Sequence, residues 1–167
     1  MNYVNHESTL SYKGRRVRLT VNWGLEEDEA PLVDDETRRA AHALALDLER
    51  ADALGRAAIQ HSLASKGEAH EYREELLDRE LHDESHFSDL ANLLSISTPE
   101  ALLDDATFMR KLQVRSVAVS FGDCPAPVVL DYTLGYDLDD PSRHISDSIL
   151  VVYLQHDGAL CAVTTES

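Results

Sequence analysis

The sequence predicts a single α+β domain in which a β-hairpin, a helical segment and a C-terminal sheet follow one another. Residues 17–23 alternate between apolar and polar side chains, residues 36–112 carry apolar residues at spacings of three and four, and residues 114–165 return to alternation. Alternation is typical of half-buried strands, and spacings of three and four are typical of one helix face. Strands at both ends with helices between them favour an α+β fold.

The N-terminal hairpin is predicted over residues 8–23. Lys13-Gly14 supplies its turn, because glycine adopts positive φ without steric cost. The apolar side chains of the second strand share one face: Val17, Leu19, Val21 and Trp23. Residues 25–36 then hold seven acidic residues and no basic residue, with Pro31 among them, which predicts a solvated linker over residues 25–35.

Two to three helices are predicted over residues 36–112. The first is capped by Asp34 or Asp35 and runs to about Leu63. The second runs from about Glu68 through Leu81, and the third begins at an N-cap Thr98, followed by Pro99, and ends near Leu112. The third helix is expected to bury Leu102, Leu103, Phe108, Met109 and Leu112. The first has a buried stripe of small residues and leucines, whose glycine predicts the close approach of another element: Ala41, Leu44, Leu48, Ala51, Gly55, Ala58 and Ser62.

An antiparallel meander of three to four strands, packed against the helices, is predicted over residues 114–165. Its alternating or apolar runs lie at 117–121, 128–134, 149–154 and 160–164. Asp157-Gly158 is the strongest hairpin signal and joins the last two runs. The run 149–154 is apolar on both faces, which predicts a central strand covered by helices.

The composition predicts one globular, cytoplasmic, bacterial domain. The chain has 167 residues, of which 43% are hydrophobic and 28% charged, a size that buries a core without crosslinks. We expect no membrane span and no signal peptide, because no long apolar run and no basic start are present. The 12 arginines against 3 lysines, together with abundant alanine, point to a GC-rich bacterial source.

The charge balance is strongly acidic, with 31 Asp and Glu against 15 Lys and Arg and a net charge of -16. Such a field repels phosphate, so we expect neither nucleic-acid nor anionic-membrane binding. It favours a basic protein partner, although the same charge also keeps a small protein soluble without any partner. We expect a monomer or a weak homodimer.

Several strings resemble a bacterial family that is known as domain of unknown function two-thousand-four. The N-terminal and helical strings are LSYKGRRVRLTVNW, VDDETRRAAHAL, HEYREELLDRELHDES and FMRKLQVRSVAVSF. The more specific C-terminal strings are VVLDYTLGYDL and SDSILVVYLQHDGALCAVTTES. The resemblance covers nearly the whole chain and implies the same fold, but it implies no catalytic residue, because members of the family have no established activity.

His82 and His86 form the best candidate for a metal site. Histidines at i and i+4 lie on one helix face, where both rings can reach one cation such as zinc, and Asp78 lies one turn earlier. The order His-Asp-x-x-His is similar to the zincin motif with aspartate in place of glutamate, which would make the chain a metal-dependent hydrolase. The alternative is a solvated helix face on which the acids raise the pKa of the histidines. A weaker calcium candidate is the acidic turn with Asp137, Asp139, Asp140 and Asp147.

Nucleophilic catalysis finds little support, since no GxSxG, P-loop or GxGxxG motif occurs. Cys124 lies in a predicted turn and Cys161 in a strand that is expected to pack, and both are expected to be free thiols.

Charge segregation is the remaining signal. Residues 68–89 hold nine acids against two bases, whereas four bases cluster at the hairpin: Lys13, Arg15, Arg16 and Arg18. The chain is therefore interpreted first as a non-enzymatic binding module, for example an immunity-type antagonist of a basic effector. Its expected partner-binding residues are Glu71, Glu74, Glu75 and Asp78. A solvated helix, or head-to-tail self-association through the hairpin, would give the same pattern.

Overall fold

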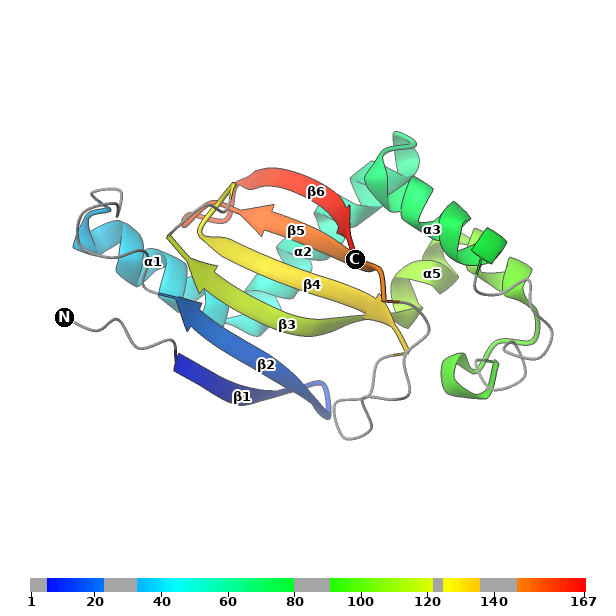
Figure 1. Cartoon of the computed structure of the whole chain (residues 1–167), viewed down its shortest axis with the longest axis horizontal. Coiled ribbons are helices and arrows are strands. Elements are labelled where there is room, and N and C mark those ends of the chain that lie inside the picture. Colours follow the sequence, from blue (N-terminus) through cyan, green and yellow to red (C-terminus); the bar gives the residue numbers. More distant parts are fainter. Residues whose placement is uncertain (1–5, 23–32, 80–90, 122–124, 136–146) are drawn as a thin grey trace.

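A mixed six-stranded sheet with helices packed against it forms the protein in this computed structural model, which describes residues 6–22, 33–79, 91–121, 125–135 and 147–167. The α+β class is as predicted (Figure 1). The strands are β1 (His6–Tyr12), β2 (Arg15–Asn22), β3 (Leu112–Ser120), β4 (Val128–Leu134), β5 (Ile149–Leu154) and β6 (Leu160–Glu166). Their spatial order follows the chain, from β1 at one edge to β6 at the other.

The hairpin and the meander belong to one sheet, because β2 pairs with β3 in parallel, with Leu19 opposite Val117. All other neighbouring strands are antiparallel. A parallel pair cannot be joined by a tight turn and needs a long crossover. The helical segment between Asn22 and Leu112 is that crossover, which the sequence patterns, taken one element at a time, did not reveal.

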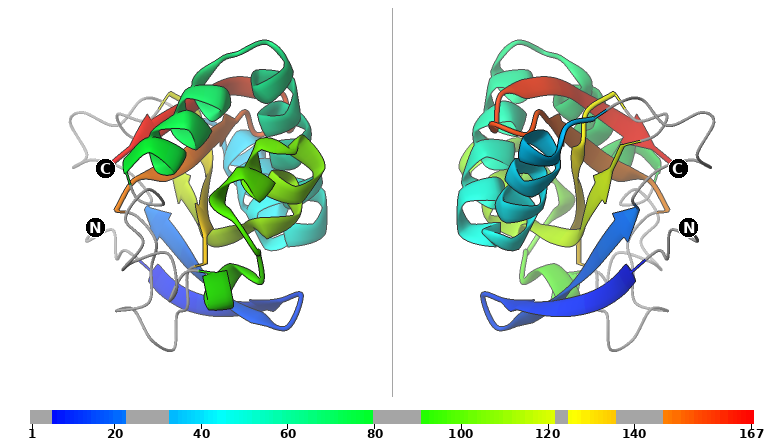
Figure 2. Two further views of the ribbon diagram at one scale, coloured as in Figure 1. Left: turned by 90° about the vertical axis from the view of Figure 1, so that its right-hand side faces the viewer. Right: turned by 90° about the vertical axis from the view of Figure 1, so that its left-hand side faces the viewer.

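The helical layer contains α1 (Asp35–Leu46), α2 (Leu48–Ala64), α3 (Glu68–Arg79), a 3₁₀ turn (Pro99–Leu103) and α5 (Asp105–Lys111). Helices α1 and α2 lie on one side of the sheet, and α3 packs beside β6 (Figure 2). No helix within the described ranges combines the length and the apolar character needed to cross a bilayer.

The first predicted helix is wrong in one respect, since two helices replace one. Asp47 separates α1 from α2 with ψ of 71°, outside the helical region, and its side chain accepts a hydrogen bond from Arg50 N at 3.2 Å. An aspartate that caps the second helix in this way competes with the continuous helical backbone. Asp34 caps α1, with Thr37 N donating to Oδ1 at 2.8 Å, as one of the two predicted alternatives.

The third predicted helix is also wrong, because a 3₁₀ turn and the short helix α5 occupy its place. The side chain of Thr98 makes no capping hydrogen bond. Asp104 instead caps α5, with Thr107 N donating to Oδ2 at 2.8 Å. The break turns Leu103 outward to 49% exposure, whereas Leu102 and Phe108 are fully buried as predicted.

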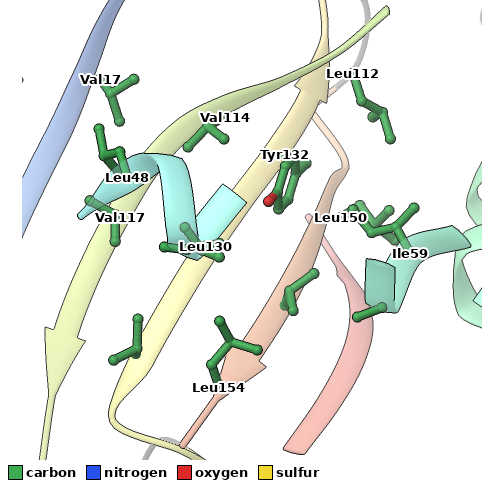
Figure 3. Packing of buried hydrophobic residues seen from close by; sticks show 14 of the residues in the cluster. Val17, Leu48, Ile59, Leu112, Val114, Val117, Leu130, Tyr132, Leu150 and Leu154 are labelled. Atoms are coloured by element: carbon green, nitrogen blue, oxygen red, sulfur yellow. The ribbon is translucent and has the colours of Figure 1, made fainter. Parts of the chain in front are cut away.

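The main core lies between the sheet and the helices (Figure 3). Leu130 and Tyr132 of β4 and Leu150 of β5 project from the sheet towards Ile59 of α2. The period-two pattern therefore identified the buried face of the strands correctly. The predicted helix stripe is buried as well, from Ala41 through Ser62.

Strand β5 is buried on both faces, as its apolar run indicates, but among the described residues the cover on its second face does not come from a helix. Val151 and Tyr153 form a separate small cluster there with Ala126 of the segment before β4. The strand is also the fifth of six rather than central. Asp157-Gly158 makes the predicted tight turn before β6, with Gly158 at φ of 92°.

The predicted close approach at Gly55 is confirmed. A Cβ atom at this position would overlap the hydroxyl oxygen of Tyr132 and lie 3.1 Å from Leu130 Cδ1. Glycine is therefore required where α2 crosses β4, and its absent side chain lets the Tyr132 hydroxyl reach the helix.

Replacing Gly55 with alanine should lower the free energy of unfolding by about 1–3 kcal/mol because of this overlap. In an unobstructed helix the same change stabilises by about 1 kcal/mol, so the sign of the effect is informative. Urea unfolding of the wild type and Gly55→Ala measures it. A more stable variant would show that α2 and β4 are not in such close contact.

Candidate functional site

A buried carboxylate, that of Asp52 in α2, is the most highly coordinated polar group in the described part of the chain. Asp52 is 1% exposed. Its Oδ2 accepts hydrogen bonds from the Tyr12 hydroxyl at 2.9 Å and from Lys13 Nζ at 3.0 Å. Arg56 Nε donates to both carboxylate oxygens at 2.9 and 3.0 Å, and the Tyr132 hydroxyl donates to Oδ1 at 3.1 Å.

These donors come from three parts of the fold. Tyr12 and Lys13 belong to the hairpin, as the last residue of β1 and the first residue of the turn, whereas Arg56 belongs to α2 and Tyr132 to β4. The guanidinium of Arg56 continues the network, since it also donates to the backbone oxygens of Met109 and Leu112 at the junction of α5 and β3. Burial raises the pKa of Asp52, but the hydrogen bonds from Lys13 and Arg56 more than offset this effect and hold the pKa below its usual range.

The coordination of Asp52 argues against a chemical role. A carboxylate offers about four lone-pair sites, and four side chains already occupy both of its oxygens. No acceptor site remains for a substrate or a cation, so Asp52 acts as a structural anchor. The sequence could have identified Asp52 as a residue with buried partners, because it lies within the apolar stripe of the first predicted helix. A lone acid on a buried helix face needs partners.

A second unusual carboxyl group, Asp131 of β4, lies on the opposite face of the sheet. Its side chain accepts a hydrogen bond from the Ser116 hydroxyl of β3. Burial raises the pKa of Asp131, and the hydrogen bond from Ser116 and the charge of Arg115 do not fully compensate. The fold therefore disfavours the ionised form of Asp131, whereas it favours the ionised form of Asp52.

The acidic stripe on α3, defined as Glu71, Glu74, Glu75 and Asp78, is the predicted partner surface. Glu74 and Glu75 lie three and four residues after Glu71, and four and three residues before Asp78, so the four residues lie along one side of the helix. Glu71, Glu74 and Asp78 are exposed and Glu75 is half-buried. Within the described chain, no hydrogen bond or ion pair engages the carboxylates of Glu71, Glu74 and Asp78.

The single arginine between residues 68 and 78 does not neutralise the acidic stripe. Arg73 is 6% exposed and points into the molecule. It pairs with Asp105 of α5 and lies over the ring of Phe108, with its guanidinium carbon 5.6 Å from the ring centre. Between residues 68 and 78, Glu71, Glu74 and Asp78 are therefore presented to solvent while Arg73 is buried.

Basic side chains gather at the other end of the fold. Arg15, Arg16 and Arg18 of β2 are exposed near the hairpin turn. This cluster belongs to the β1–β2 edge of the sheet, whereas α3 packs beside β6 at the opposite edge. The predicted charge segregation therefore follows the two edges of the sheet.

A groove of about 490 Å³ runs along α1 and is lined by Asp35, Arg38, Arg39, His42, Ala43 and Leu46. Its arginines make it an unsuitable surface for a basic partner. Arg38 Nε is buried without a hydrogen-bond partner, and the guanidinium carbon lies 5.8 Å from the ring centre of Phe121.

The predicted metal site lies mostly outside the described residues, since His82 and His86 both fall in the range 80–90. Asp78 is exposed on α3. Among the residues that the structure describes, no group of three or more potential metal ligands converges. The zinc hypothesis stays a prediction. A thermal melt that rises with zinc, and no longer does so in His82→Ala/His86→Ala, would establish the site.

The remaining predicted positions are divided between described and undescribed segments. Asp137, Asp139, Asp140 and Cys124 lie outside the described residues. Cys161 is a free thiol, as expected, and its side chain is exposed, while its strand β6 packs against β5 and α3, as expected. Position 161 lies in the edge strand β6, where one side has no neighbouring strand.

Comparison of the chain with protein-family models, curated proteins and solved structures gave no match. The resemblance to domain of unknown function two-thousand-four stays a prediction from the sequence.

The carboxyl groups of Asp52 and Asp131 should respond oppositely to substitution by asparagine. Asp52→Asn should lower the free energy of unfolding at neutral pH by about 3 kcal/mol, since it leaves Arg56 and Lys13 without their charged partner. Asp131→Asn should leave it unchanged within about 0.5 kcal/mol or raise it, because the ionised form is disfavoured there. Urea unfolding at pH 7 compares the two variants with the wild type.

The pH dependence of the free energy of unfolding follows from the pKa shifts of Asp52 and Asp131. The folded pKa of Asp52 is lowered, so its contribution is present above the unfolded pKa and is lost as the pH falls below about 4. The folded pKa of Asp131 is raised, so its contribution is lost as the pH rises. The free energy of unfolding should therefore fall less steeply with falling pH in Asp52→Asn than in the wild type. An unchanged slope on the acid side would contradict the anchor role.

Proposed function

We propose that the protein is a non-enzymatic binding module that recognises a basic protein through the acidic stripe on α3. The observation that carries this proposal is the exposure of Glu71, Glu74 and Asp78 on one helix side, while Arg73 of the same helix is turned into the core. A surface of one sign attracts oppositely charged partners and raises their association rate by about 10- to 1,000-fold.

Two further features support a binding role. The buried carboxylate of Asp52 is occupied by its own chain, so it supplies no free base or ligand. The sheet and the helical layer hold α3 in place through Tyr72, whose hydroxyl donates to Ser148 O at 3.3 Å, and through the pair of Arg73 with Asp105. A helix fixed at two points presents its charges in a defined arrangement, which reduces the entropy lost on binding.

The finer proposal is that this partner is a basic effector protein and that the chain acts as its intracellular, immunity-type antagonist. Its support is the acidic charge of -16 combined with the compact size. A carboxylate surface can cover the cationic site with which an enzyme of nucleic acids holds its substrate, because both ligands present anionic oxygen atoms.

The test is a matched pair of charge-reversal variants. The stripe variant, Glu71→Lys/Glu74→Lys/Asp78→Lys, and an off-stripe variant, Glu7→Lys/Glu49→Lys/Glu100→Lys, change the net charge equally at exposed positions. Each is immobilised beside the wild type, and proteins captured from a lysate at low salt are identified by mass spectrometry. We expect a basic partner that the wild type and the off-stripe variant retain and the stripe variant loses.

The association rate with that partner should fall at least tenfold in the stripe variant at low ionic strength. The difference should shrink towards 1 M salt, where the screening length is about 3 Å. Equal capture by both variants would show that net charge, rather than the stripe on α3, governs binding.

A further inference from the structure

Strand β6 forms one edge of the sheet among the described strands. Its pairing with β5 is irregular between Tyr153 and Leu154, and α3 packs against it, but the strand has neither lysine nor proline along its length. It is the last strand in the spatial order and pairs with β5 alone. Natural edge strands are usually protected by lysine, proline or a short length, because their unpaired backbone groups can pair with another chain. Leu160–Glu166 has seven residues, no lysine and no proline, and none of these residues is fully buried.

The one charged residue of β6 does not protect the edge either. Glu166 Oε1 accepts hydrogen bonds from the hydroxyl of Tyr153 on β5 and, at 3.5 Å, from Thr164 Oγ1. Its carboxylate is therefore held by the sheet itself. Among the described strands, none lies along the upper side of β6 in Figure 1.

The orientation of α3 places further acids beside this edge. Tyr72 faces the strands, because its hydroxyl reaches Ser148 O just before β5, and Arg73 faces α5. Successive helical residues are about 100° apart, so Glu68 and Glu75 lie beyond Tyr72 on the side away from Arg73. Since α3 packs against β6, this flank of the helix borders the edge.

We propose that β6 is a docking edge for an extended basic segment of the partner, which adds a seventh strand to the sheet. This inference rests on the proposed function and specifies how the partner is held. Backbone hydrogen bonds to β6 would provide affinity, and every second side chain of the added strand would point to the helix side. Lysine or arginine at those alternate positions would meet the carboxylates of Glu68 and Glu75.

Charge decides between this occupant and a second copy of the chain. Antiparallel pairing of β6 with β6 of another copy would bring two α3 helices, each with its acids, to the same edge. Like charges at a contact cost several kcal/mol, so such a dimer is disfavoured. An extended segment of opposite charge has no such cost.

The probe is a synthetic seven-residue peptide in which lysine alternates with valine. Two matched controls are the same peptide with proline at the central valine, which cannot form a continuous strand, and the same peptide with glutamate for every lysine. Binding to the full-length chain is measured by fluorescence anisotropy at low salt. Hydrogen exchange of the backbone amides of residues 160–166 is measured with and without peptide.

We expect the alternating lysine peptide to bind, the proline peptide to bind at least tenfold more weakly, and the glutamate peptide not to bind. Amide exchange should slow within residues 160–166. Glu68→Gln/Glu75→Gln should weaken binding of the lysine peptide about fivefold, since two charge pairs near the surface are lost.

Each alternative outcome has one meaning. Equal binding of the lysine and proline peptides, without slower exchange in β6, overturns strand addition but leaves the acidic stripe as a binding surface. Slower exchange in β6 that persists in the stripe variant supports strand addition and counts against the stripe. Failure of the lysine peptide to bind overturns the docking edge, whereas the capture experiment with the stripe variant decides the proposed function separately.

Discussion

The carboxylate of Asp52 receives hydrogen bonds from the hairpin turn, from its own helix and from β4, and the rest of the architecture depends on this convergence. A parallel pair of strands separated by a crossover of this length brings distant segments together, and the loss of chain entropy must be offset by specific contacts. Asp52 supplies such contacts at the point where β2, β3 and α2 meet. Gly55, one turn later on the same helix, allows the approach of Tyr132 that completes the network.

The sequence predicted the elements better than their connections. Alternation in β2 and β4 located the buried faces because side chains on a pleated strand alternate strictly. Gly55, within a stripe of small residues and leucines, correctly predicted that another element approaches the helix closely at this point. The break at Asp47 and the 3₁₀ turn before Asp104 were missed, because apolar spacing continues across both positions while aspartate side chains locally compete for the backbone. The parallel joint of β2 with β3 leaves no signal in either strand, since it depends on contacts between segments far apart in the chain.

The candidate surface could be predicted in part, because the helical period places residues at regular spacings on one side. Acids at spacings of three and four on α3 define one helix side from sequence alone, and Glu71, Glu74 and Asp78 are exposed there. The inward direction of Arg73 could not be predicted, because it depends on Asp105 and Phe108 of a different helix. The position of this helix beside the edge strand β6 could not be predicted either, and it brings a backbone edge and an acidic surface into one region.

The central claim is that partners meet the protein at the edge formed by α3 and β6. The most direct measurement is a backbone chemical-shift map of the isotope-labelled chain, recorded while a captured basic partner is added. The account predicts that the shifts concentrate in residues 68–78 and 160–166, with little change around Lys13–Arg18. Shifts that concentrate on the hairpin turn or along α1, and leave α3 and β6 unchanged, would contradict it.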